Sequence, residues 1–515
     1  MALPGSGSAG PSASLPTAAD ASSAGPSRRA VVGAAAWAAP AITILGAAPA
    51  FAVSGASVTV PTATGLIGAG TGAIYLSFSP APTTAPAPAV TFSDRGATAG
   101  TLRAVGVSGG AAVYRLPFST TTSPVPPAIT VTVSVPGYGI ATTSVTMSVG
   151  GTHDARLGLQ LDGPVNALAR QADGRLVVGG AFASASGQTR RGVLRLTRDG
   201  VLDLPDPAIV GEVLAVAVQA DGRILVAGSI TSVAGQPRQW LARLTVDGSL
   251  DTSFVPASLP GLARAVVAAP DGTVYVGGEI AGDPVQGYVA RLTSSGAASP
   301  AFTRPALDGA VHALALVPRP GAEPAVMVGG DFAEADGTSV SRLFRLLPDG
   351  SRDPGFGDAG VTGPVHAVAV LRGGGVVAVG DFTIVSSYNM SGIARYDSSG
   401  MLDDRLDSAG LGQVGRTAVG RAVLVQPDGG VVVAGDFNGV LDSQMETRPR
   451  SFVARIRLDD GLEVDATFVD AGLDAEARAL ALDEDGLITV GGAFTQVGVS
   501  PRPIRAAQRI VRLFG

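Results

Sequence analysis

After residue 152, apolar and polar residues alternate in short runs, and many of these runs end at a glycine. Seven such marker glycines align with one another: Gly180, Gly228, Gly278, Gly330, Gly380, Gly435 and Gly492. Their spacings are 48, 50, 52, 50, 55 and 57 residues, with a mean of 52, and residues 152–515 number seven times this mean. Alternation with a period of two predicts β-strands, and a regular period of this length predicts a repeat architecture.

The second repeat illustrates the strands that are expected in each unit. Its alternating or apolar runs cover residues 213–219, 223–227, 240–245 and 250–254. Asp221-Gly222 joins the first two runs, and this dipeptide favours a type I′ hairpin turn with positive φ at both residues. Three or four antiparallel strands in each of seven units predict an all-β fold, a seven-bladed β-propeller over residues 151–515. A β-solenoid is the alternative, although its repeats are usually shorter.

The two ends of the repeat array predict a closed ring. The last unit stops at Phe514-Gly515 without a closing element. Residues 154–157, before the first unit, match the closing Asp-x-x-Phe element of residues 251–254. Residues 152–160 are therefore expected to complete the last blade, which would leave no exposed sheet edge in the ring.

A different pattern fills residues 53–150, which are rich in Ser, Thr, Val and Pro and contain four charged residues. Alternation predicts strands at residues 57–60, 74–78, 89–92, 102–107, 112–117, 129–135 and 143–149. Seven short strands in 98 residues favour a small Ig-like β-sandwich. A Ser/Thr/Pro-rich stalk is the alternative.

Residues 1–52 have the composition of a targeting segment. Residues 1–26 are rich in Ala, Ser, Gly and Pro, which predicts a disordered n-region. Arg28-Arg29 then precedes an apolar run that ends in Ala50-Phe51-Ala52, a small-x-small cleavage pattern. This arrangement resembles a twin-arginine export signal, and an ordinary Sec signal or a retained anchor are the alternatives. Cleavage after Ala52 predicts a secreted or extracellular protein with no membrane span in the mature chain.

The composition excludes several classes of function. The chain contains no cysteine, and all of its 36 basic residues are arginine. Disulfide scaffolds, thiol nucleophiles and Schiff-base lysines are therefore excluded. The net charge of −6 argues against nucleic acid as a partner. We expect a monomer with no cofactor and no metal site, and we assign no catalytic residue.

The repeat motif is specific enough to suggest a family. It reads PDG-x-apolar-x-apolar-x-G-x-F and then ARL-x-x-DG-x-x-D-x-x-F, and residues 242–254 are its nearest copy. In this motif the chain resembles the delta-60 repeat family over residues 152–515. The resemblance implies an extracellular bacterial β-propeller, and it implies no activity, because none is assigned to that family. The third unit departs from the motif at Ser295 and Ser299, and the fifth departs at Gly373-Gly374 and Leu406.

One position near the start of the first strand carries most of the candidate chemistry, and we call it the ring position. Its residues are Asn166, Leu214, Arg264, His312, His366, Arg421 and Arg478. If the first strands line a central channel, the six polar residues form a largely basic ring that suits an anionic ligand. The alternative is a position that tolerates polar residues where water enters.

Two further positions have simpler interpretations. Four acids follow a marker glycine: Glu279, Asp331, Asp381 and Asp436. They would bind a cation if they lay together, but pairing with arginines or turn capping is the expectation. An arginine also recurs in the third strand of every unit: Arg195, Arg243, Arg291, Arg345, Arg395, Arg455 and Arg512. We expect these arginines to build the blades.

Two classes of function remain open on this reasoning. Seven similar units without a catalytic set favour a secreted or cell-surface, non-catalytic binding or adhesion scaffold. Its partner would be a surface protein or a polysaccharide, contacted by the variable loops at residues 383–392 and 438–450. The alternative is a secreted enzyme that acts on a carbohydrate or an anionic polymer, with His312 or His366 as acid/base. A purely structural surface protein is a third possibility.

The secreted protein is expected to begin at Val53, because the small-x-small pattern ends at Ala52. N-terminal sequencing or the intact mass of protein from the culture medium measures this directly. A chain that keeps its first 52 residues in the membrane fraction would contradict cleavage.

Overall fold

A computed structural model describes residues 57–66, 71–79, 81–82, 86–108, 111–120, 128–136, 138–148, 154, 157–413, 417–498, 504–506 and 509–514. The predicted export signal and His153 lie outside these residues. The described part of the chain is built from β-strands and one 3-10 turn, η1 (Asp404–Leu406). It contains no helix that is long and apolar enough to cross a membrane.

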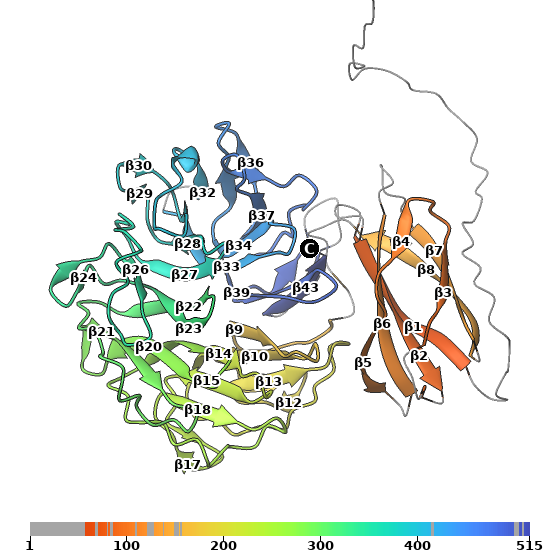
Figure 1. Ribbon diagram of the computed structural model, residues 1–515, viewed down its shortest axis with the longest axis horizontal. Coiled ribbons are helices and arrows are strands. Elements are labelled where there is room, and N and C mark those ends of the chain that lie inside the picture. The colour runs from red at the N-terminus through yellow and green to blue at the C-terminus, as the bar shows by residue number, and fades with distance from the viewer. Residues whose placement is uncertain are drawn as a thin grey trace, which may run out of the picture. The chain divides into compact units, whose positions relative to one another are not determined.

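Residues 57–148 form a β domain of eight strands (Figure 1). They are β1 (Ser57–Leu66), β2 (Thr71–Ser79), β3 (Ala89–Phe92), β4 (Ala97–Ala99), β5 (Arg103–Ser108), β6 (Ala111–Thr120), β7 (Ala128–Val135) and β8 (Gly139–Ser148). Their order is β3-β7-β8-β1-β2-β6-β4, with β5 also paired to β6. Seven of the eight lie at the predicted places, and the alternation missed only the three-residue β4.

The core of this domain explains the alternation in its sequence. Ile74, Leu76 and Phe78 of β2 are fully buried, and so are Val131 and Val133 of β7. These side chains belong to one hydrophobic cluster although β8 and β1 separate the two strands in the sheet order. The strands therefore fold over a shared core, with alternate residues pointing into it.

Seven sheets follow one another along residues 165–514, and each contains three or four antiparallel strands. The first strands are β9 (Val165–Arg170), β14 (Val213–Val218), β19 (Ala263–Ala268), β22 (Val311–Arg319), β27 (Val365–Val370), β33 (Val419–Val425) and β39 (Ala477–Leu482). The second strands are β10 (Leu176–Gly180), β15 (Ile224–Gly228), β20 (Val274–Ile280), β23 (Ala322–Gly330), β28 (Val376–Gly380), β34 (Val431–Asp436) and β40 (Leu487–Gly492). The third strands are β13 (Val193–Leu196), β18 (Leu241–Leu244), β21 (Asp283–Leu292), β26 (Leu343–Leu346), β31 (Ile393–Tyr396), β37 (Val453–Arg457) and β43 (Ile510–Phe514).

Several units also contain shorter strands besides their first, second and third strands. Five outer hairpins join second to third strands: β11–β12 (Ser184–Ala185, Gln188–Thr189), β16–β17 (Ser232–Val233, Gln236–Pro237), β24–β25 (Glu334–Ala335, Thr338–Ser339), β29–β30 (Ile384–Val385, Tyr388–Asn389) and β41–β42 (Gln496–Val497, Arg505–Ala506). In the sixth unit β32 (Gly410–Gly412), β35 (Gly439–Leu441) and β36 (Thr447–Pro449) form a separate small sheet. β38 (Glu463–Val464) is the fourth strand of the sixth sheet.

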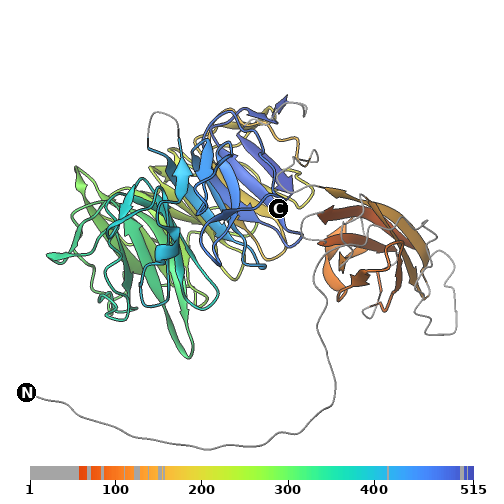
Figure 2. The same cartoon turned by 90° about the horizontal axis from the view of Figure 1, so that it is seen from above.

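The seven sheets form a ring. The first strand of each sheet contacts the first strand of the next, and β39 of the seventh sheet contacts β9 of the first. Figure 1 shows the sheets in this order from yellow to blue, and Figure 2 shows the same ring turned by 90°. The first strands are thus innermost. The second strands are buried along most of their length.

The turns between first and second strands differ from the predicted type I′ geometry. In the turn at Asp173-Gly174, the glycine takes a φ of 85°, whereas the aspartate is outside the positive-φ region. Gly174 N–H donates to Gln171 O, and Gln171 N–H donates to Arg175 O, both at 2.9 Å. This is a three-residue loop, a type I turn followed by a left-handed glycine. Asp173 instead accepts the Arg175 N–H at 3.0 Å through its carboxylate.

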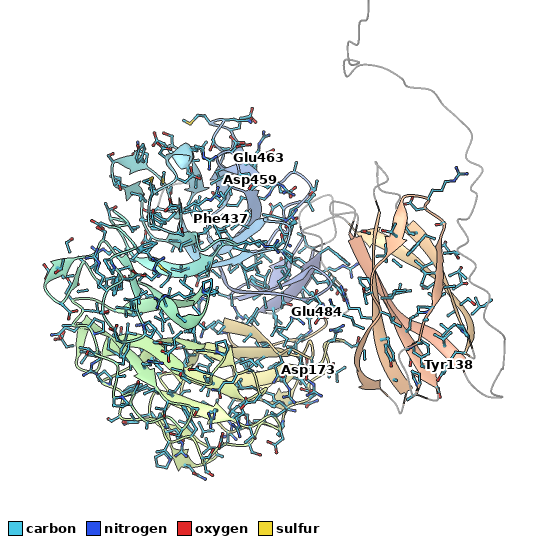
Figure 3. The ribbon with its side chains drawn as sticks, viewed as in Figure 1. Tyr138, Asp173, Phe437, Asp459, Glu463 and Glu484 are labelled. Atoms are coloured by element: carbon cyan, nitrogen blue, oxygen red, sulfur yellow. The ribbon has the colours of Figure 1, made fainter. Side chains whose placement is uncertain are left out.

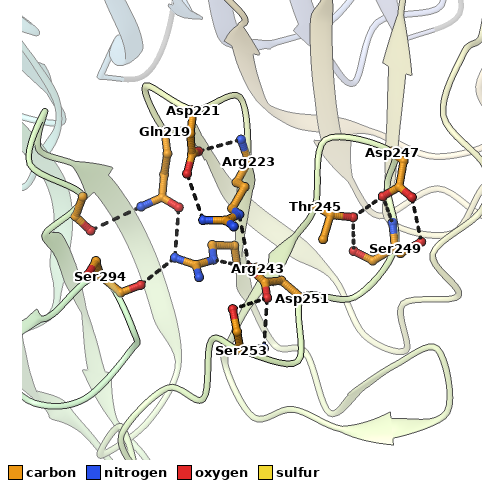
Figure 4. Close-up of polar contacts among 11 residues, drawn as sticks. Gln219, Asp221, Arg223, Arg243, Thr245, Asp247, Ser249, Asp251, Ser253 and Ser294 are labelled. Atoms are coloured by element: carbon orange, nitrogen blue, oxygen red, sulfur yellow. Dashed lines mark hydrogen bonds and ion pairs between the residues drawn. The ribbon is translucent and has the colours of Figure 1, made fainter.

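The recurring arginine of the third strand binds its own sheet and the next one (Figure 4). Arg243 Nε lies 2.8 Å from the Asp251 carboxylate, which belongs to the closing segment of the same unit. Its Nη1 donates to the Ser294 carbonyl of the next sheet at 2.7 Å. The guanidinium also lies over the Phe254 ring, 4.4 Å from its centre. Because both charges are buried, these bonds hold the sheets in register.

The same arrangement repeats around the ring. Arginine–aspartate pairs occur in six of the seven units: Arg195–Asp203, Arg243–Asp251, Arg345–Asp353, Arg395–Asp403, Arg455–Asp465 and Arg512–Asp154. The third unit has Ser299 in place of the aspartate, and there Arg291 binds Glu323 at 2.8 Å. Six of the seven arginines donate to a carbonyl of the following sheet, and Arg455 is the exception. These residues therefore build the ring, as their recurrence indicated.

The last sheet is completed by residues that precede the first. Asp154 N–H donates to the Arg512 carbonyl at 2.7 Å, and the Asp154 carboxylate lies 2.9 Å from Arg512 Nε. Arg512 also donates to the Arg198 carbonyl of the first sheet at 2.8 Å. The expected closure by residues 152–160 is therefore seen at Asp154, in the part of that segment that the structure describes.

Replacing Asp251 with alanine should leave the buried Arg243 charge without its carboxylate. We expect the free energy of unfolding to fall by roughly 3 to 5 kcal/mol, as for other broken buried ion pairs. Urea denaturation measures the change. Asp221→Ala is the matched control, because Asp221 pairs with Arg223 at the surface with half of its side chain exposed. The control should change the value by less than about 1 kcal/mol, and equal effects would contradict the role given to Asp251.

Candidate functional site

Each residue at the ring position is the extra residue of a β-bulge. In the third unit Ala263 pairs with Gly278 and Ala265 pairs with Gly277, so Arg264 has no partner on the second strand. The same one-residue shift falls at Asn166, Leu214, His312, His366, Arg421 and Arg478. A bulge bends the strand and changes the direction of its side chain. The ring position, which was selected from the sequence alone, is therefore structurally equivalent in all seven units.

The marker glycines explain why every unit contains this bulge. A Cβ at Gly278 would overlap the carbonyl oxygen of Leu262, which lies just before the first strand of the same unit. The other six marker glycines meet the corresponding carbonyl in the same way. Glycine is thus required where the bulged strand approaches the second strand most closely. The bulge at the ring position and the marker glycine therefore occur together in every repeat.

Most ring residues are bound to carboxylates. Both Nε and Nη2 of Arg264 lie 2.9 Å from Glu279 Oε2. Arg478 Nε donates to Glu476 Oε1 at 2.8 Å, and Arg421 Nε lies 3.7 Å from the other oxygen of Glu476. The guanidinium charges of the predicted basic ring are therefore largely balanced by neighbouring acids.

Hydrogen bonds continue this network across three sheets. Arg478 Nη1 of the seventh sheet donates to Asn166 Oδ1 of the first at 3.0 Å. Asn166 Nδ2 in turn donates to Glu212 Oε1 before the second sheet at 2.8 Å. Arg478 and Asn166, the ring residues of two neighbouring sheets, are thus in direct contact.

The two histidines lie next to each other. The ring centres of His312 and His366 are 5.3 Å apart, and His312 Nε2 lies 2.9 Å from Asp331 Oδ2. Burial would raise the pKa of Asp331, but the hydrogen bond from His312 lowers it below its usual value. Burial, with the nearby charges of Arg421 and His312, lowers the pKa of His366 to about 3. His366 is therefore a neutral imidazole at physiological pH.

Two acids of this site were missed by the sequence reasoning. Glu212 and Glu476 stand two residues before the ring position, where the other units have Pro164, Leu262, Ala310, Pro364 and Val419. An acid in two units out of seven gives no periodic signal.

The four acids after the marker glycines are not gathered into one cluster. Among the described residues, no group of three or more His, Asp or Glu side chains is arranged to hold a metal ion.

Part of the repeat region matches the model of a known family. Residues 171–204, 219–254, 269–302 and 326–356 match a family described as a domain of unknown function (DUF5122), β-propeller. Residues 171–356 therefore contain β-propeller repeats. Three of the matched stretches begin directly after a first strand, and the fourth begins within β23. All four end in the closing segment of their unit, so all ring positions lie outside them. A search of curated proteins and a search of solved structures find no match.

The low pKa of His366 predicts a pH-dependent stability. The unfolded chain binds the proton near the ordinary pKa of about 6.5, whereas the folded chain binds it only near 3. Stability from the neutral histidine is complete above the higher value and is lost as the pH falls towards the lower one. The loss between about pH 7.5 and pH 5 should be about 2 kcal/mol.

Urea denaturation at the two pH values, with wild type and His366→Gln, measures this loss. The variant should lack it, because glutamine does not titrate. His312→Gln is the matched control and should keep most of the loss, because burial, the first cause of the low pKa of His366, is retained. An equal loss in wild type and His366→Gln would show that another group titrates.

Proposed function

We propose that this protein is an exported, non-catalytic binding scaffold of the delta-60 repeat type. In this proposal a seven-bladed β-propeller follows a small Ig-like β-sandwich, and residues 1–52 act as the export signal. The partner is a surface protein or a polysaccharide outside the cell. The seven consecutive sheets and the closing contact of Asp154 with Arg512 support the blade count.

The observation that carries the proposal is the separation of constant and variable residues within each unit. The marker glycine, the third-strand arginine and its aspartate recur around the ring and hold the sheets together. The bulged ring residue changes from Asn to Leu, Arg or His on this constant framework. A framework that repeats while one displayed side chain varies suits recognition of an extended partner, since many different contacts are presented together.

The outer hairpins also belong to the proposed binding surface. Each begins just after a marker glycine, and residues that precede the first strand bridge to it, as in the pairs Val210–Ser232 and Val361–Val385. The hairpins and the ring position therefore lie at the same end of their sheets. The hairpins present exposed polar residues such as Gln188, Thr189 and Gln236. Amide and hydroxyl groups of this kind bind polar polymers through hydrogen bonds.

Thermal unfolding of the secreted chain with a panel of neutral and anionic polysaccharides tests the proposal. A ligand that binds only the folded state stabilises it by about 2.7 kcal/mol at a hundred times its Kd. We expect a saturable rise of Tm with at least one polymer, and a smaller rise for the double variant His312→Ala with His366→Ala. Polymer chains must stay intact during the measurement. Shortening of the polymer would contradict a non-catalytic role and favour the enzyme alternative.

A further inference from the structure

A cavity of about 920 Å³ opens between the fifth and sixth sheets. Val370, Val425 and Leu482, the last residues of β27, β33 and β39, lie on its inner side. The ring position lies at the start of the same strands. The cavity is therefore at the opposite end of the first strands from the ring residues. Its volume lies within the usual range of small-molecule sites.

A bridge that joins two other pairs of neighbouring sheets is absent at this cavity. In the first sheet Gln171 Nε2 donates to the Gly222 carbonyl in the turn of the second sheet, at 2.8 Å. Gln219 makes the same bridge to Gly272 at 3.3 Å. The fifth sheet has Leu371 at this position, which shares the backbone hydrogen bond of Gln171 but cannot cross to the next turn.

The turn itself leaves the space open. Residues 373–375 are three consecutive glycines, two of them with φ of 98° and 88°. They place backbone at the wall of the cavity and no side chain in it.

The charged groups of the cavity differ in how far they are already bound. The Asp403 carboxylate accepts from Arg405 Nε and Nη2 at 2.8 Å and from Arg395 Nη1 at 3.2 Å. Asp428 binds Arg455 and the Gly430 N–H. By contrast, no hydrogen bond or ion pair within the described residues engages the exposed Arg372 guanidinium. Its five N–H donors are available to a ligand.

The remaining walls complete a mixed surface. The exposed carboxylate of Asp459, labelled in Figure 3, also lines the cavity and lies in the turn between β37 and β38. Leu371, Leu402 and Leu482 are half-buried and add apolar surface. Tyr396 offers no exposed ring, because it is buried and its hydroxyl donates to the Ala359 carbonyl at 3.0 Å. A neutral sugar would therefore find no aromatic platform here.

We infer that this cavity binds an acidic saccharide, a short oligomer of a uronic acid. Its carboxylate binds Arg372, because guanidinium and carboxylate match in a bidentate pair. Its hydroxyls donate to Asp459, and its C–H face packs on the leucines. The inference stands independently of the proposed function, since the cavity and the ring residues lie at opposite ends of the sheets.

Isothermal titration calorimetry of the secreted chain with a galacturonic acid trisaccharide tests the inference, with a neutral galactose trisaccharide as the comparison ligand. The uronate should bind at least tenfold more tightly than the neutral sugar, because a hydrogen bond to a charged group is lost with the latter. Arg372→Gln should remove this preference. Leu371→Gln should weaken binding as well, because glutamine at this position restores the bridge across the cavity.

Arg319→Gln is the matched control. Arg319 is an exposed arginine of the hairpin between β22 and β23, and it does not line the cavity. It should leave the affinity unchanged, and thermal unfolding checks that every variant is folded. Equal binding of the two sugars, or no uronate binding, would overturn the inference and leave polymer binding at the ring untouched. Uronate binding that survives Arg372→Gln but is lost in the His312→Ala, His366→Ala variant would place the ligand at the ring and overturn the inference.

Discussion

An arginine in the third strand joins its sheet to the closing segment in six of the seven units. Six of the seven arginines also join the next sheet. The first strands touch one another, but they are short and rich in small residues. Apolar packing alone therefore does little to fix the angle between neighbouring sheets. Charge-assisted hydrogen bonds are directional, and a buried guanidinium without its partners is costly. The position of every sheet, and so of every side chain at either end of the ring, depends on this residue.

A second constraint acts at the other end of each sheet. The marker glycine lets the start of the first strand come close, and the bulge that results turns one side chain out of the strand pairing. Because the backbone fixes this geometry, the side chain is free to vary between units. Charge balance then limits the variation, since Arg264 and Arg478 each need an acid at a neighbouring position. The site is therefore a balanced polar network and not a simple basic ring.

Much of the architecture was accessible from the sequence because it is periodic. The alternation placed three strands of the second unit within a residue or two, whereas the predicted run at residues 250–254 has only the isolated bridge of Leu250 to Leu244. The recurring Arg243 and Asp251 positions proved to be bonded partners. Features that occur once or twice were not accessible. Glu212 and Glu476 do not recur at the same position of the other units, so the sequence does not mark them. Their role is seen only in the structure, where they bind ring residues. The Asp-Gly dipeptide did not fix the turn type, because the loop contains one residue more than a type I′ turn allows.

The bond between Asp154 and Arg512 joins two residues that lie far apart in the chain. The other sheets each come from a continuous stretch of chain, so their strands meet at a small loop-closure entropy. The seventh sheet needs two residues separated by nearly the whole ring, so its closing contact has a larger loop-closure entropy. Until this contact forms, its last strand keeps an open edge, and Asp154 of a second copy would fit that edge as well as its own. Slow formation of this contact would therefore favour exchange of the Asp154 segment between two copies, as in a domain-swapped dimer.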